Sequence, residues 1–353
     1  MGLWHGVPGA ATAAPPVLQR ARGHFLSDPI RPAAWLPGRH LQSIFGPLLR
    51  RPARLPLRRE RWELPDGDFV DADRFGPREP GDAGSPTLLV LHGLEGSSET
   101  AYSHGLLREA HQRGWGGTCL NFRSCSGEPN RLLRSYHSGH TEDLAFALGK
   151  LRAERPGAPI VCAGVSLGGN VLAKWLGEQG AAAREAVRAA VAISTPFDLA
   201  LSARALDGPG FWALAYRRRF LATLLAKARA KSARFPLQLG PGRLRGIHTL
   251  REFDERVTGP IHGFTGADDY YARCSSGPLL PLVRVPLLLI SAEDDPFVPP
   301  ASLPIEAARS NPSVTLELSP AGGHVGFVGG APWRPRYLAE ERAGAWLAAR
   351  IAG

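Results

Sequence analysis

Residues 160–170 read IVCAGVSLGGN, an apolar run that passes through a G-x-S-x-G pattern into a stretch of small residues. The apolar run predicts a buried strand and the residues after Ser166 predict a helix, so the serine stands at a sharp turn between them. Glycines two positions on either side of it allow the strand and the helix to approach closely. Because a serine hydroxyl needs such presentation to a base before it can attack a carbonyl, the pattern predicts that Ser166 is a catalytic nucleophile.

A second apolar segment supports this interpretation. A G-x-S-x-G pattern also arises by chance in a chain with 41 glycines, as a tight turn without chemistry. Residues 88–93, LLVLHG, form another apolar run that ends in His-Gly, a common source of an oxyanion-binding amide at the edge of a parallel sheet. The backbone N–H groups of Leu94 and Leu167 are therefore predicted to form an oxyanion hole. His92 itself is interpreted as a structural residue.

Strands and helices alternate around these two motifs. A strand–turn–strand pattern covers residues 61–73. After it, short apolar strands are expected at 87–91, 117–122, 159–163, 189–193, 286–290 and 314–318. Helices are expected at 102–113, 142–152, 168–176, 301–308 and 337–352, with Thr141 as the N-cap of the second. Apolar strands without internal alternation, separated by helices, predict an α/β fold with a mostly parallel central sheet and helices on both faces.

A break in this alternation divides the chain. Residues 197–280 contain mostly helical, arginine-rich segments, which predict a helical cap inserted late in the sheet. The core is then expected to comprise residues 26–196, with an extended basic arm before the hairpin, and residues 281–353. Residues 1–25 are rich in alanine, glycine and proline and are predicted to be a disordered leader.

The catalytic acid is expected at the end of the strand that follows the cap. Residues 287–299, LLLISAEDDPFVP, are an apolar strand that runs into an acidic turn, and catalytic groups of open α/β sheets gather at the carboxyl ends of strands. Three carboxylates compete there: Glu293, Asp294 and Asp295. Asp295 stands four residues before a proline, as the acid of this kind of turn commonly does. It is therefore preferred over Asp294, which is interpreted as a turn-forming or solvated residue.

Only one of the 11 histidines follows that acid. His324 lies in GGHVGF, residues 322–327, after the last predicted strand. The order serine, acid, histidine is the one expected in this architecture, and a flexible Gly-Gly-His loop can place the imidazole between Ser166 and Asp295. His324 is therefore predicted to be the general base, and Asp295 to orient it. Such a triad needs no cofactor.

No metal site is predicted. His137 and His140 lie in YHSGH, residues 136–140, but no cysteine or carboxylate set converges with them by spacing, so they are interpreted as hydrogen-bonding residues. The four cysteines show no C-x-x-C spacing, which excludes a disulfide framework and a zinc site as expectations. The sequence therefore predicts a catalytic centre made only of protein groups.

The formal charge of +10 comes almost wholly from arginine. A basic surface can attract nucleic acid or an anionic membrane, but no basic stretch is interleaved with aromatic residues as single-strand binders require, so nucleic-acid binding is not predicted. The basic cap residues Arg217–Arg219, Lys227, Arg229 and Lys231 could contact a membrane, although a solvated helix face is the preferred interpretation. The start of the chain lacks the order of a secretory signal, and no apolar run reaches about 18 residues. A cytoplasmic location is expected.

Several longer stretches resemble the YheT-type α/β hydrolases of bacteria, which are kin to eukaryotic abhydrolase-domain lipases and yeast medium-chain ester synthases. They are HLQS (40–43), LPDGDFVD (64–71), HGLEGS (92–97), NFRSCSGEPN (121–130), GVSLGGN (164–170), REFD (251–254) and IHGF (261–264). The resemblance covers the chain from about residue 30 to its end. It implies an α/β-hydrolase fold, carboxylic-ester hydrolysis, and a triad at the matching positions Ser166, Asp295 and His324.

The motifs and the resemblance together predict a serine-dependent esterase or lipase that acts through an acyl-enzyme on short- to medium-chain acyl esters. An acyltransferase that passes the acyl group to an alcohol is the alternative. A non-catalytic binding module on the same fold is a third hypothesis, against which the intact triad argues. Apolar residues in the cap, from Phe211 to Leu225, either line an acyl pocket or pack the cap onto the core, and the sequence favours neither. The partner expected is a small-molecule or lipid acyl ester.

Overall fold

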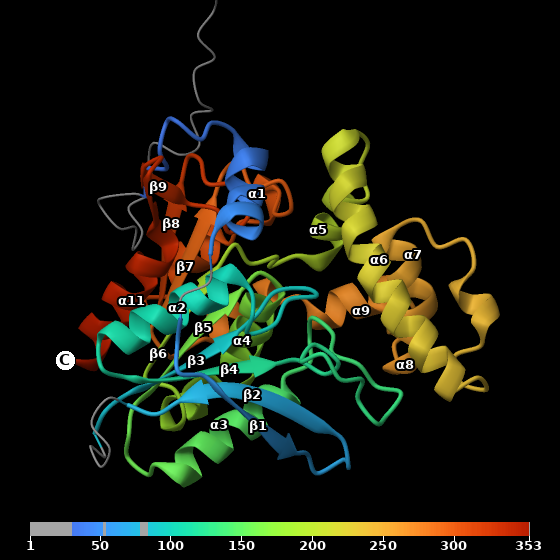
Figure 1. Cartoon of the computed structure of the whole chain (residues 1–353), viewed down its shortest axis with the longest axis horizontal. Helices are drawn as coiled ribbons and strands as arrows, with labels where there is room; N and C mark the ends of the chain where they lie inside the picture. The colour runs from blue at the N-terminus through green and yellow to red at the C-terminus, as the bar shows by residue number, and fades with distance from the viewer. Residues whose placement is uncertain (1–29, 52–53, 78–83, 353) are drawn as a thin grey trace, which may run out of the picture.

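The computed structural model describes residues 30–51, 54–77 and 84–352. The predicted disordered leader, residues 1–25, lies outside these residues. Eight strands form one sheet in the order β1-β2-β4-β3-β5-β6-β7-β8 (Figure 1). They are β1 (Arg58–Glu63), β2 (Phe69–Phe75), β3 (Thr87–Leu91), β4 (Gly116–Asn121), β5 (Ile160–Val165), β6 (Ala189–Ile193), β7 (Leu287–Ala292) and β8 (Val314–Ser319).

The sheet is mostly parallel. Strands β3 to β8 run parallel to one another, whereas β2 pairs antiparallel with both β1 and β4. In the register, Leu91 of β3 lies opposite Gly164 of β5, and Val165 of β5 lies opposite Ile193 of β6. The last residues of these three strands therefore lie beside one another at the carboxyl edge of the sheet.

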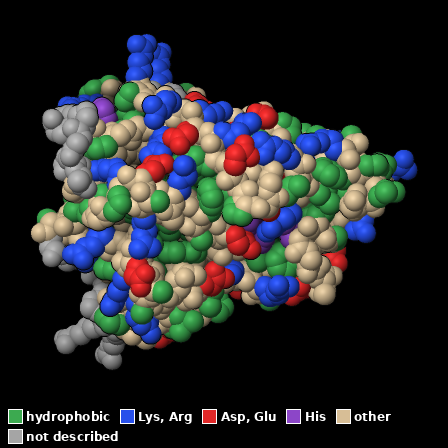
Figure 2. All heavy atoms as spheres, turned by 90° about the horizontal axis from the view of Figure 1, so that it is seen from below, with side chains coloured by type: hydrophobic (Ala, Val, Ile, Leu, Met, Phe, Trp, Pro, Cys, Tyr) green, Lys and Arg blue, Asp and Glu red, His purple; other side chains and the backbone are tan. Residues whose placement is uncertain are grey.

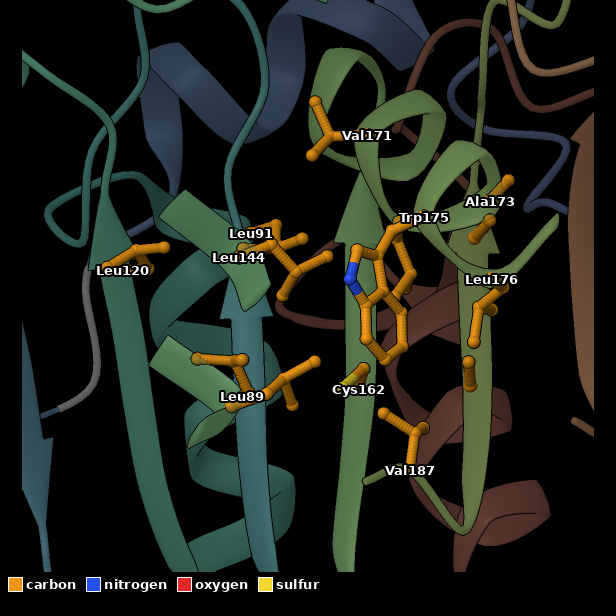
Figure 3. Close-up of a cluster of buried hydrophobic side chains, with 14 of the residues drawn as sticks. Leu89, Leu91, Leu120, Leu144, Cys162, Val171, Ala173, Trp175, Leu176 and Val187 are labelled. Carbon is orange, nitrogen blue, oxygen red and sulfur yellow. The ribbon is translucent and has the colours of Figure 1, made fainter. Parts of the chain in front are cut away.

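Helices cover both faces of the sheet, because the strands carry apolar side chains on both. Leu89 and Leu91 of β3 pack with α3 (Glu142–Glu154) and α4 (Leu167–Gln179), and Figure 3 shows this cluster around Trp175. Leu88 and Val90 point to the opposite face, where they pack with α2 (Ala101–Gln112) and α11 (Leu338–Ile351). Burial on both faces explains the continuous apolar runs in the sequence.

The cap is inserted between β6 and β7. Its helices are α5 (Leu199–Leu206), α6 (Phe211–Arg234), α7 (Leu250–Phe253), α8 (Gly259–Ile261) and α9 (Ala267–Cys274). They lie together at one side of the sheet, as the yellow and orange helices of Figure 1 show. The predicted fold class, a mostly parallel sheet between helices with a helical cap inserted late in it, is confirmed.

Some local predictions were wrong. Helix α1 (Arg39–Leu49) and the hairpin of β9 (Val328–Ala331) and β10 (Arg334–Tyr337) were not predicted. Helix α10 (Ile305–Ser310) begins four residues later than expected, after Pro304. The last residues of the predicted basic arm belong to the edge strand β1, where Arg59 and Arg61 pair with carboxylates of β2. Thr141 takes the N-cap position of α3, but its hydroxyl donates to Glu178 at 2.9 Å and does not cap the helix.

Glycines at the crossing of β3, β5 and α4 let these elements touch. A Cβ on Gly168 would lie 2.4 Å from the carbonyl oxygen of Leu91 and 2.5 Å from that of His92. A Cβ on Gly164 would lie 2.5 Å from the carbonyl oxygen of Gly168. Real side chains do not fit at such distances, so the close packing around the serine turn requires both glycines.

Gly168→Ala is expected to destabilise the fold by about 1–3 kcal/mol or more, because the backbone carbonyls that it would meet, at the end of β3 and in the residue after it, cannot shift alone. Gly149→Ala is the control. Gly149 is exposed on α3, and its Cβ would meet nothing within 4 Å. That change should be neutral or stabilising by up to about 1 kcal/mol. Chemical denaturation measures both, and equal unfolding free energies for the two variants would contradict the prediction.

Candidate active site

Ser166 occupies the turn between β5 and α4. Its φ of 52° lies in the left-handed region, which a residue with a side chain rarely adopts. Such a conformation costs about 1–3 kcal/mol and persists only where the surroundings impose it. Here the serine N–H donates to the carbonyl of Ile193 in β6 at 2.8 Å, and α4 begins at the next residue. The turn thus presents the hydroxyl at the carboxyl edge of the sheet.

The structure brings together the three side chains that the sequence singled out. The Oγ atom of Ser166 lies 2.9 Å from Nε2 of His324. On the other side of the ring, Nδ1 lies 2.9 Å from Oδ2 and 3.1 Å from Oδ1 of Asp295. The Asp295 side chain is only 1% exposed, and it also accepts hydrogen bonds from the N–H groups of Phe297 (2.8 Å) and Val298 (3.2 Å). These donors hold the carboxylate toward the imidazole.

Asp294, the competing acid, has a different partner. Its Oδ1 accepts a hydrogen bond from the N–H of Gly323 at 2.9 Å, and burial raises its pKa above the usual value. Asp294 therefore fixes the loop that carries His324, whereas Asp295 contacts the imidazole itself. The sequence interpretation of Asp294 as a solvated or turn residue missed this contact.

Helix α1 also holds the His324 loop. The hydroxyl of Ser43 accepts the N–H of His324 at 2.8 Å. The amide of Gln42 accepts the N–H of Val328 at 2.7 Å and donates to the carbonyls of Val328 and Leu36. Both residues belong to the HLQS stretch, residues 40–43, to which the sequence assigned no role. No local pattern could have found them, because the burial of Gln42, which is only 2% exposed, comes from its contacts with Val328.

The predicted oxyanion amides lie beside Ser166. Leu94, Leu167 and Ser166 line one cavity, and no hydrogen bond from either amide to another described residue occurs. The carbonyl of Gly93 accepts hydrogen bonds from Nδ1 of His92 (2.8 Å) and from the N–H of Gly96 (3.0 Å). In a trans peptide the N–H points opposite to the C=O, so these bonds fix the N–H of Leu94 on the other side of the peptide.

His92 is fully buried and has a single tautomer that satisfies its contacts. Its Nε2 accepts the N–H of Phe122 at 3.0 Å and so carries no proton, which leaves the proton on Nδ1 for Gly93. Burial lowers its pKa to about 4. The neutral ring therefore links the residues that follow β3 and β4 through hydrogen bonds, as expected of a structural residue rather than a base.

A cavity of about 150 Å³ joins Ser166 and His324 to the interior of the cap. Its apolar walls come from α5, α6, the α7 region and the turn after β7. They include Leu199, Ala203, Leu206, Phe220, Leu224, Leu250, Phe253, Val257, Ile261 and Phe297. The apolar residues from Phe211 to Leu225 thus do not all serve one purpose: some line the pocket and others pack within the cap. Phe220 and Leu224 line the cavity, Leu221 packs in the cap core, and Phe211 is 74% exposed.

The basic residues of the cap do not form one solvated face. Arg218, Arg219 and Arg229 are exposed, but Lys231 is buried and donates to backbone carbonyls, so that part of the interpretation was wrong. Lys227 also turns inward and pairs with Glu95. On the face drawn in Figure 2, arginine and lysine side chains are interspersed with acidic ones rather than gathered in one patch.

The described residues contain no group of three or more His, Cys, Asp or Glu side chains suited to a metal ion. His137 packs against the ring of His262 at 4.6 Å between centroids, and His140 lies 3.0 Å from Glu142. The four cysteines are buried free thiols. Among the helices of the described ranges, none has the length and apolar character needed to cross a membrane.

The chain is similar to known proteins over most of its length. The profile of the family described as alpha/beta hydrolase fold matches residues 86–331. The YheT protein of Escherichia coli (strain K12) is 42% identical over 311 residues, which cover 87% of this chain and 89% of that protein. Phospholipase ABHD3 of Mus musculus is 31% identical over 85% of this chain and 73% of its own. The structure of the Pyrococcus furiosus esterase Pf2001 superposes with a TM-score of 0.55 at 17% identity, covering 86% of this chain and all of that one, and shows a shared fold.

The protonation of His92 gives a testable pH dependence. Its folded-state pKa of about 4 lies below the unfolded value of 6.5, so the unfolded chain binds the proton first as the pH falls. Neutral His92 therefore contributes its full share to the free energy of unfolding above about pH 6.5. That share, roughly 3 kcal/mol, is lost as the pH falls toward 4 and below. The variant His92→Asn should therefore show a flatter decline of the unfolding free energy between pH 7 and 4.5, as measured by chemical denaturation. Parallel declines in the two proteins would contradict the prediction.

Proposed function

The chain belongs to the α/β-hydrolase family, and from that premise we propose that it is a serine-dependent carboxylic-ester hydrolase acting through an acyl-enzyme on short- to medium-chain esters. The family and the relatives, one of them named a phospholipase, make it a hydrolase of the esterase and lipase kind. The observation that carries the finer proposal is the unbroken contact from the Ser166 hydroxyl through His324 to Asp295. A strained serine turn supports it, because such strain is retained where it presents a nucleophile.

The proposed reaction uses only groups of this chain. His324 takes the proton of Ser166 as the serine oxygen attacks the ester carbonyl, and Asp295 stabilises the imidazolium that forms. The amides of Leu94 and Leu167 donate to the oxyanion of the tetrahedral intermediate. His324 then returns the proton to the leaving alcohol as the C–O bond breaks. Water attacks the acyl-enzyme by the same steps and releases the acid and the free serine.

The cavity supports the proposed chain length. Its volume of about 150 Å³ is similar to that of a cavity that holds a benzene ring, or about six carbons. Its walls beyond Ser166 are mostly aliphatic and aromatic side chains of the cap, such as Phe220 and Leu224. An acyl chain of short to medium length would gain apolar burial there without displacing the cap.

Ser166→Ala is expected to abolish labelling by a fluorophosphonate probe and to reduce ester hydrolysis by at least about 10³-fold. The natural chain should hydrolyse p-nitrophenyl esters with a maximum of kcat/KM at short to medium acyl length. Circular dichroism checks that the variant is folded. A folded natural chain that takes up no probe and hydrolyses none of the esters would overturn the proposal.

Asp295→Asn is expected to lower kcat by about 10³- to 10⁴-fold, because an amide at this position no longer holds the imidazole in the productive tautomer. Asp294→Asn is the matched control, since its carboxylate contacts Gly323 and not the ring. It should lower kcat by about tenfold at most. Steady-state kinetics on one ester compares the two, and the reverse ranking would transfer the role of the acid to Asp294.

A further inference from the structure

The turn that carries the Leu94 amide is held in an unfavourable shape. Residues 93–96 form a turn closed by the N–H of Gly96 and the carbonyl of Gly93 at 3.0 Å. Its third residue, Glu95, has a φ of 55°, where glycine or asparagine is normally found. Contacts outside the turn must therefore hold Glu95 in place. The first is a hydrogen bond from its N–H to the hydroxyl of Tyr136 at 2.8 Å.

The side chain of Glu95 supplies the second contact. Its Oε1 accepts the hydroxyl of Tyr136 at 2.7 Å, so the tyrosine bonds both the backbone and the carboxylate of one residue. The Glu95 side chain is 6% exposed, and its Oε2 has no hydrogen-bond partner among the described residues. An enclosed carboxylate needs a positive partner to remain charged without a large penalty.

That partner comes from the cap. Nζ of Lys227, on α6, lies 2.9 Å from Oε1 of Glu95 and 3.3 Å from Sγ of Cys125, and it stands 5.8 Å from the centroid of the Tyr136 ring. Lys227 also lines the cavity that contains Ser166. The positive charge that pairs with Glu95 is thus carried by a cap residue 132 positions later in the chain.

The same helix reaches the other side of the catalytic centre. Tyr216, three turns before Lys227 on α6, packs edge-on against Phe297 at 4.7 Å, and Phe297 lies 4.3 Å from the ring of His324. The C-terminal end of α6 is attached elsewhere. There, Arg234 donates to the carbonyls of Asn130 (2.7 Å) and Arg131 (3.0 Å), and it makes no hydrogen bond or ion pair with residues 93–96.

We propose that Lys227 is a positioning residue of the oxyanion hole. Lys227 can pair with Glu95 only while α6 lies over the turn of residues 93–96. The pair holds that turn, and the turn directs the N–H of Leu94 toward the developing oxyanion. The inference rests on the proposed esterase function. It implies that the cap does more than enclose the acyl chain: it completes the catalytic centre even for an ester too small to occupy the cap.

Hydrolysis of p-nitrophenyl acetate tests this, because an acetyl group does not need the acyl-binding walls of the cap. Lys227→Met should lower kcat by about tenfold or more, with KM changed by about twofold at most, since the lost interaction acts in the transition state. Lys227→Arg, which keeps the charge, should recover most of the kcat. In a Glu95→Gln background, where the enclosed charge is gone, Lys227→Met should lower kcat much less.

Arg234→Met is the matched control, because it removes a cation of the same helix and its hydrogen bonds to Asn130 and Arg131 but leaves the Lys227–Glu95 pair in place. Its kcat should stay within about twofold of the natural value. A trifluoromethyl ketone, which forms a tetrahedral oxyanion on the serine, adds a second readout. Its affinity for Lys227→Met should fall by the same factor as kcat/KM. Unfolding temperatures confirm that the variants are folded.

Equal losses in Lys227→Met and Arg234→Met, an unchanged kcat, or a fall in kcat without weaker ketone binding would each overturn the positioning role. In those cases the natural chain still hydrolyses the ester and the proposed function stands. A natural chain that neither hydrolyses the ester nor binds the ketone would overturn both proposals, because the positioning role presupposes the reaction.

Discussion

The contact between the hydroxyl of Ser166 and the imidazole of His324 joins two segments that are 158 residues apart in the chain. It can form because β5, β6, β7 and β8 are consecutive neighbours in a parallel sheet, so the loops after them leave the same edge. The position of each partner is then fixed by hydrogen bonds from main-chain N–H groups. β6 accepts the N–H of Ser166, two amides orient Asp295, and Ser43 accepts the N–H of His324. The proposed chemistry depends on this alignment.

Close backbone packing and buried polar contacts set the other half of the centre. The glycines two positions from Ser166 allow α4 to lie against the end of β3, which brings Leu94 and Leu167 to one cavity with the serine. A neutral, buried His92 then fixes the direction of the Leu94 amide through the carbonyl of Gly93. Because these contacts are satisfied without net charge, they can stand in the core without the desolvation cost of an ion.

Much of the fold and of the candidate site could be predicted from local patterns. Apolar runs of strand length mark a sheet buried on both faces, and the turn sequences around Ser166, Asp295 and His324 each carry their own residue signature. Helices and strands that are stabilised mainly by contacts with distant residues could not be predicted in this way. Helix α1 contains Gly46 and Pro47, which disfavour a helix locally, and it is held instead by Gln42 and Ser43 against the His324 loop.

The sequence alone thus determined which side chains could perform the chemistry and the architecture that brings strand ends together. Tertiary structure decided what local patterns cannot encode: that Asp294 holds the loop of His324, and that Lys227 and Lys231 turn inward from a helix whose sequence predicts a solvated face. The physical reason is that charge pairing and burial depend on partners from distant segments. Adjacent carboxylates, or lysines one turn apart, have the same local propensities, and only the fold gives them different neighbours.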